Sequence, residues 1–174
     1  MDWLQTVNWP PIFMGLLTLA MVIVIVQDTV SYLITNTMNL FLLGLYPFAV
    51  FLLGIHGWPM ALVAAGIVLV IGLGIFALGL MGGGDIKLLV VLTLWVGWGM
   101  PALQFIFMTA IFGGALVVIV LLARLLLAPL WRSVRRTENL PRILTRKQPV
   151  PYGIAIAAAF LLMVWTQQVP ALHQ

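Results

Sequence analysis

Apolar residues in this chain fall into six stretches, separated by short segments rich in glycine, proline and charged residues. A helix needs roughly 20 mostly apolar residues to cross the hydrocarbon core of a bilayer. Most of the connecting segments contain only a few residues, so consecutive helices should be antiparallel neighbours. The pattern predicts an all-α, polytopic integral membrane protein with about six transmembrane helices, near residues 11–33, 40–55, 60–80, 86–98, 102–127 and 151–165.

The composition supports this prediction. Only 7% of the residues are charged and 64% are hydrophobic, whereas a soluble domain has about 25% charged residues on average. The outer surface must therefore be largely apolar, and lipid is its natural solvent. The chain contains no cysteine, which excludes disulfides, thiol chemistry and cysteine zinc sites. Its length suits a single membrane-embedded domain over residues 1–174.

Basic residues gather on one side of the predicted membrane. Seven of the eight Lys and Arg residues lie between the fifth and sixth stretches or just before that segment, and the eighth, Lys87, lies between the third and fourth. The positive-inside rule places these loops in the cytoplasm, so residues 131–149 form a basic cytoplasmic loop and both termini are extracytoplasmic. We interpret the net charge of +4 as a topology signal that contacts anionic membrane lipids, with substrate steering as the alternative, and expect no nucleic-acid partner.

Two of the four acidic residues, Asp28 and Asp85, lie at the cytoplasmic ends of predicted spans. A charge there is costly, by about 2.5–3.5 kcal/mol at a helix centre and less near an end, so it usually has a function. The structural alternatives are an N-cap role for Asp85 and a snorkelling polar residue at a helix end for Asp28. Two carboxylates that face one another in a low-dielectric site share a proton. One can then deprotonate water while the other donates to a carbonyl, which is the chemistry of an aspartic protease.

Three motifs resemble those of a known family. Residues 82–88, Gly-Gly-Gly-Asp-Ile-Lys-Leu, resemble the GxGD-x-K signature of the type IV prepilin peptidases, which are membrane-embedded aspartic proteases. Asp28, followed eight positions later by Asn36, resembles the family's first motif, and residues 150–155 resemble its VPYGxA segment. The first motif departs from the family, which usually has arginines just after the aspartate and a proline before the asparagine. The resemblance implies that Asp28 and Asp85 are the catalytic pair.

The resemblance also implies the activity. It indicates an aspartic endopeptidase in the bacterial cytoplasmic (inner) membrane that removes the short leader peptide from a type IV or Flp-type prepilin, or from a pseudopilin, at the cytoplasmic face. No metal and no organic cofactor are implied. The short chain is similar to the peptidases of tight-adherence pilus systems and lacks the cysteine-containing insert of larger relatives. We therefore expect no N-methyltransferase activity.

Several residues are expected to support the site. Gly82, Gly83 and Gly84 let the backbone leave the helix and let a substrate strand or a partner helix approach closely. Lys87 could hold a carboxylate charged, bind a lipid phosphate or simply anchor the topology. Asn36 could form a hydrogen bond near the site or cap the second helix. Pro in a first turn is well tolerated, so residues 151–152 are expected to begin the last helix.

Two other classes of protein remain as alternatives. The first is a non-catalytic membrane protein, either a transporter subunit, which could use the two acids for proton or cation relay, or an assembly scaffold that has kept the fold. A transporter site is expected near the membrane midplane, whereas both acids lie at one face and no internal repeat is evident. The presenilin-like proteases also use a GxGD motif, but their first aspartate normally follows a tyrosine, and Gln27 precedes Asp28 here.

Overall fold

Six α-helices make up the part of the chain that the computed structural model describes, which covers residues 8–135, 150–166, 168–169 and 172, with side chains as far as residue 126 in the first range. No strand occurs among these residues, and the predicted all-α class is confirmed. The helices are α2 (Trp9–Ser31), α3 (Asn36–Leu53), α4 (Trp58–Ala77), α5 (Gly83–Val96), α6 (Met100–Arg135) and α7 (Tyr152–Trp165).

Helix boundaries follow the local residue types. Proline occupies the first turn of α2 and of α4, where its missing N–H costs nothing. A left-handed residue ends α2 at Tyr32 and α3 at Gly54, which is a common way to close a helix. The predicted helix positions are therefore close to the observed ones. The exception is α6, which continues to Arg135, so residues 131–135 of the predicted basic loop are helical. Residues 136–149 of that loop lie outside the described residues.

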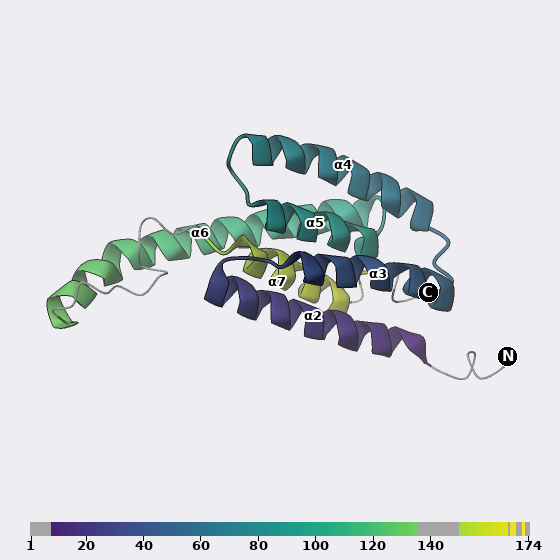
Figure 1. Cartoon of the computed structure of the whole chain (residues 1–174), viewed down its shortest axis with the longest axis horizontal. Helices are drawn as coiled ribbons and strands as arrows, with labels where there is room; N and C mark the ends of the chain where they lie inside the picture. The colour runs from purple at the N-terminus through teal and green to yellow at the C-terminus, as the bar shows by residue number, and fades with distance from the viewer. Residues whose placement is uncertain (1–7, 136–149, 167, 170–171, 173–174) are drawn as a thin grey trace.

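Two short helices, α5 and α7, occupy the inside of the bundle (Figure 1). Helix α5 packs against α3, α4, α6 and α7, and α7 packs against α2, α5 and α6. Eight of the 14 residues in each of these helices are buried, whereas about a quarter of each longer helix is buried. The longer helices therefore surround the inner pair and present apolar side chains outward.

The four outer helices are each long and apolar enough to cross a membrane: Trp9–Ser31, Asn36–Leu53, Trp58–Ala77 and Met100–Leu126. The inner helices, with 14 residues each, rise only about 21 Å, which is less than the hydrocarbon core of about 30 Å. Four long apolar helices suffice to identify a multi-pass membrane protein. Six complete spans and two extracytoplasmic termini remain predictions.

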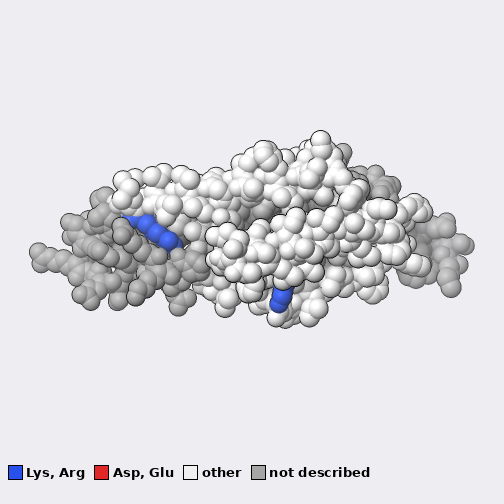
Figure 2. All heavy atoms as spheres, turned by 90° about the horizontal axis from the view of Figure 1, so that it is seen from above, with Lys and Arg blue, Asp and Glu red and all other residues white. Residues whose placement is uncertain are grey.

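The outer surface and the core both fit that environment. Large apolar side chains such as Phe51, Val70 and Leu78 are more than 70% exposed, and Figure 2 shows a face that is white except for small blue areas, with no red on its described part. Inside, Trp95 is fully buried and packs edge-on against Tyr46 at a ring-centroid distance of 5.4 Å. Its Nε1–H donates to the backbone oxygen of Leu42 at 3.2 Å, which ties α5 to α3.

Candidate active site

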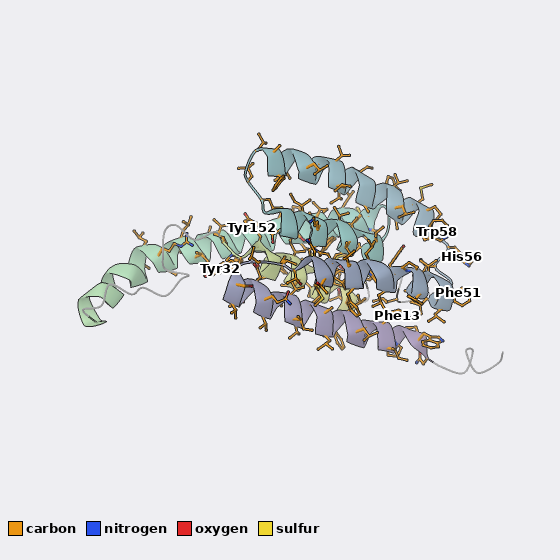
Figure 3. All side chains as sticks on the ribbon, in the orientation of Figure 1. Phe13, Tyr32, Phe51, His56, Trp58 and Tyr152 are labelled. Carbon is orange, nitrogen blue, oxygen red and sulfur yellow. The ribbon has the colours of Figure 1, made fainter. Side chains whose placement is uncertain are left out.

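The chemically distinctive residues gather at one end of the bundle, where α2 ends and α5 and α7 begin. We call it the aspartate end. Figure 3 shows Tyr32 and Tyr152 at this end, whereas Phe51, His56 and Trp58 lie at the opposite one. The sequence prediction that Asp28 and Asp85 share one end of the bundle agrees with this arrangement, because Asp28 is in the last turn of α2 and Asp85 in the first turn of α5.

Asp28 is buried, with only 3% of its surface exposed. Its Oδ2 accepts a hydrogen bond from the backbone N–H of Ile154 at 3.2 Å, and the N–H of Gly153 also donates to the carboxylate. Both donors belong to the first turn of α7, whose N-cap residue, Pro151, has no side-chain acceptor. The first N–H groups of a helix lack partners within the helix, so Asp28 caps α7 from a different helix. The snorkelling alternative is wrong, because the side chain points into the protein.

Asp85 is the third residue of α5, since that helix begins at Gly83 with Gly82 as its N-cap. The predicted N-cap role is therefore wrong. The half-buried carboxylate instead reaches back to the backbone N–H of Gly82, as an acidic residue at the third helical position does in a capping box. Ile34 contacts both Gly84, which precedes Asp85, and Gly153, which lies against the Asp28 carboxylate. The two carboxylates, from α2 and α5, therefore lie near enough for the charge of Asp28 to act on Asp85.

The three glycines before Asp85 serve close packing. A Cβ on Gly82 would lie 2.9 Å from Oδ2 of Asp85, and one on Gly84 would lie 3.3 Å from the backbone oxygen of Ile34. A Cβ on Gly83 would be 3.5 Å from the ring of Phe76, which is ordinary contact. The first and third glycines therefore provide space around the carboxylate and for the segment between α2 and α3.

Lys87 and Asn36 form a hydrogen bond across the aspartate end. The Nζ of Lys87 donates to Oδ1 of Asn36 at 2.9 Å, and both residues are exposed. Asn36 is the first residue of α3, and its N-cap is Thr35, so the predicted capping role of Asn36 is wrong. The pair links the first residue of α3 to the second turn of α5.

Two residues of the site carried no predicted role. A Cβ on Gly153 would lie 2.7 Å from Cδ1 of Ile34 and 2.8 Å from Oδ2 of Asp28, so no larger residue fits there without a shift. Ile34 itself is buried between this glycine and Gly84. Both positions belong to the motifs recognised in the sequence, and the motif matches were the available signal. Residues 151–152 begin α7 as predicted, with Pro151 as the N-cap and Tyr152 as the first helical residue.

The donor set of the site consists of the two carboxylates. Within the described ranges, no three His, Cys, Asp or Glu side chains come together as ligands for a metal ion. The absence of a metal and of an organic cofactor remains an expectation from the sequence.

Four long apolar helices with two carboxylates at one end of their bundle define a multi-pass membrane protein with an acidic pair. The sequence model of the Type IV leader peptidase family matches residues 15–130, two thirds of the chain. The chain belongs to this family of peptidases, and the matched region contains Asp28, Asn36, Asp85 and Lys87. No curated protein and no solved structure matches the chain significantly.

Proposed function

We propose that this protein is a membrane-embedded aspartic endopeptidase that removes the leader peptide of type IV or Flp-type prepilins at the cytoplasmic face of the bacterial inner membrane. The observation that carries the proposal is the placement of Asp28 and Asp85, two carboxylates on different helices, beside glycines that both contact Ile34. The family membership, the burial of Asp28 and the placement of both acids at one end of the bundle support it.

The proposed reaction is the hydrolysis of a peptide bond by an activated water molecule. One carboxylate, in its ionised form, takes a proton from water as the oxygen attacks the scissile carbonyl carbon. The other, in its protonated form, donates to the carbonyl oxygen. The first carboxyl group then gives its proton to the leaving nitrogen as the second recovers one from the tetrahedral intermediate, which collapses to the acid and the free amine. Two adjacent carboxylates favour this shared-proton state because their like charges disfavour double ionisation.

Backbone contacts hold both carboxylates in place. Asp28 is oriented by the amides of Gly153 and Ile154, and Asp85 by the amide of Gly82. Catalysis depends strongly on such positioning. Gly82 and Gly84 leave room for the Asp85 carboxylate and for the backbone of Ile34. The Lys87–Asn36 hydrogen bond joins α5 to the start of α3. We assign these residues supporting roles and the two aspartates catalytic roles.

The basic residues determine the proposed topology. Lys87 lies at the aspartate end, and most of the other basic residues occur in the sequence shortly before α7, which begins at that end. The positive-inside rule then makes this end cytoplasmic. Both termini are then extracytoplasmic. A prepilin leader in the cytoplasm would meet the aspartates where its hydrophobic helix enters the membrane. N-methyltransferase activity is not part of the proposal.

The test is cleavage of a Flp-type prepilin that is co-reconstituted with the protein in liposomes. Wild type is compared with Asp28→Asn and Asp85→Asn, and thermal melting establishes that each variant is folded. An asparagine oxygen can still accept the amide hydrogen bonds, so the substitution isolates the proton chemistry from the structural role. We expect wild type to cleave and both folded variants to be inactive.

The other outcomes separate the alternatives. Full activity in either folded variant would contradict the assignment of the catalytic pair. Failure of the wild-type protein on several prepilins would favour a membrane scaffold or transporter subunit. Mass spectrometry of the product, from a reaction supplied with S-adenosylmethionine as methyl donor, tests whether the activity is limited to proteolysis, because an N-methylated product would contradict it.

A further inference from the structure

The segment between α2 and α3, residues 32–35, crosses the aspartate end and is here called the strap. Of its four residues only Ile34 is buried, at 9% exposed, whereas its neighbour Leu33 is 69% exposed and Thr35 is also exposed. A single apolar side chain thus points inward from a segment that otherwise lies on the surface.

Ile34 lies between the first turns of the two inner helices. A Cβ on Gly84 of α5 would be 3.3 Å from its backbone oxygen and 3.4 Å from its Cβ. A Cβ on Gly153 of α7 would be 2.7 Å from its Cδ1. Gly84 precedes Asp85, and Gly153 donates to Asp28. Ile34 therefore contacts both of these glycines, each of which lies next to one of the two carboxylates. It occupies the space that a peptide would need in order to reach Asp28 and Asp85 together.

Backbone hydrogen bonds hold both ends of the strap, from the Tyr32 N–H to the Asp28 oxygen at 3.1 Å and from the Met38 N–H to the Thr35 oxygen at 3.2 Å, whereas its middle is held mainly by the packing of Ile34. Its first residue, Tyr32, has a φ of 56°, a left-handed conformation that costs a non-glycine residue free energy. The side-chain hydrogen bonds to the strap, from Ser31 to the Leu33 oxygen and from Thr35 to Gln27, are both exposed and long at 3.4 Å. Thr35 and Gln27 also border an open, mostly apolar groove of about 520 Å³ between α2 and α3. The middle of the strap can therefore move outward with the loss of these two long hydrogen bonds and of the packing of Ile34.

We propose that the strap is a gate: Ile34 blocks the gap between α5 and α7 and must move outward before a substrate peptide reaches Asp28 and Asp85. The proposal rests on the proposed peptidase function. Access to the site is then controlled by the chain itself, and the gate opens when the substrate's extended segment replaces Ile34 between Gly84 and Gly153.

A reversible disulfide provides the test. The chain contains no cysteine, and the distance of 3.4 Å between the Ile34 Cβ and a Cβ built on Gly84 is close to the range of about 3.5–4.5 Å found in disulfides. The double variant Ile34→Cys/Gly84→Cys should lock the strap when oxidised. We expect its rate of prepilin cleavage to fall at least 20-fold on oxidation and to return when dithiothreitol reduces the bond.

A second double variant is the matched control. A Cβ built on Gly72 of α4 would lie 3.7 Å from the Cβ of Ile86 on α5. The variant Gly72→Cys/Ile86→Cys should therefore form a disulfide between α4 and α5 that does not involve the strap. Its cleavage rate should be the same in both redox states. If the oxidised Ile34→Cys/Gly84→Cys protein, with its disulfide verified by mass spectrometry, cleaves as fast as its reduced form, the gate is contradicted.

Thiol labelling reports the opening of the gate without catalysis. In the background of Asp85→Asn, an Ile34→Cys variant should react slowly with a maleimide and at least fivefold faster when prepilin is added, while Leu33→Cys reacts at one rate throughout. An unchanged rate at position 34, with prepilin binding confirmed by co-purification, contradicts the gate. A wild-type protein that cleaves no prepilin contradicts the proposed function, whereas an oxidised lock that still cleaves contradicts only the gate.

Discussion

Asp28 on α2 accepts a hydrogen bond from the backbone amide of Ile154 on α7, 126 residues further along the chain. The contact joins the first described helix to the last and uses the same carboxylate that we propose for catalysis. Its structural and chemical roles can be separated by substitution, because the first requires only an acceptor oxygen and the second requires a group that exchanges protons.

Substitutions of Asp28 should affect stability and activity differently. Asp28→Ala leaves the first N–H groups of α7 without an acceptor and should lower the free energy of unfolding by about 1–3 kcal/mol. Asp28→Asn keeps an acceptor and should cost less than about half of that. Both variants should lose cleavage. Thermal melting in detergent measures the difference in stability, and equal destabilisation by the two substitutions would show that the carboxylate does not cap α7.

Gly153 should be intolerant of a side chain. In Gly153→Ala, the new Cβ would overlap Ile34 and the Asp28 carboxylate at 2.7–2.8 Å, so that one of them must shift. Small misplacements of a catalytic group can cost about 100-fold in rate, and we expect cleavage to fall by about 10- to 100-fold. Gly44→Ala on α3 is the control, since a Cβ there meets nothing within 4 Å. If both variants cleave at the wild-type rate, Gly153 is not needed to keep Asp28 in its catalytic position.

The Lys87–Asn36 hydrogen bond should contribute little to stability. Both residues are exposed, and exposed interactions that involve a charge typically contribute about 0.2–1 kcal/mol. A double-mutant cycle with Lys87→Ala and Asn36→Ala measures the coupling through chemical unfolding. Lys87→Gln keeps a donor for Asn36 but removes the charge, so it should retain most of the cleavage rate. A topology anchor would instead tolerate Lys87→Arg and not Lys87→Gln.

Trp95 should stabilise the bundle without affecting the chemistry. Trp95→Phe removes the donor to the Leu42 oxygen and part of a fully buried ring, and should lower the free energy of unfolding by about 1–3 kcal/mol. Trp95 lies ten residues after Asp85 on α5, about 15 Å along the helix axis. The cleavage rate per folded molecule should therefore stay within about twofold of wild type, and a larger loss would indicate that the core transmits strain to the aspartate end.

Much of the fold could be predicted because it depends on local properties. Apolar length, proline and glycine mark where each helix begins and ends, and the order of the helices assigns Asp28 and Asp85 to the same end. Local preferences also explain the errors. Asp85 follows three glycines and is a plausible N-cap, but the helix begins two residues earlier. The continuation of α6 through residues 131–135 was missed because its charged residues resemble those of a loop.

The contacts of the site could not be predicted in the same way. Nothing near Asp28 in the sequence indicates that its partner is the first turn of α7, because that pairing depends on how α2 and α7 pack. The same holds for Ile34, which is one apolar residue among many and gains its position from glycines on two other helices. Motif resemblance pointed to the segments that meet at the aspartate end, and the packing shows how their residues touch.

The shortness of α5 and α7 has a consequence for the lipid environment. The inner helices are about 9 Å shorter than the hydrocarbon thickness, taking 1.5 Å per residue. Helix α5 carries Asp85, and the first turn of α7 donates to Asp28. Because longer helices surround α5 and α7, their shortness leaves room at the end of the bundle that polar groups and water can enter from the interface, to an extent that depends on bilayer thickness. Acyl-chain length should thus act on the peptidase as an effector does, with short-chain lipids hydrating the carboxylates and long-chain lipids burying them.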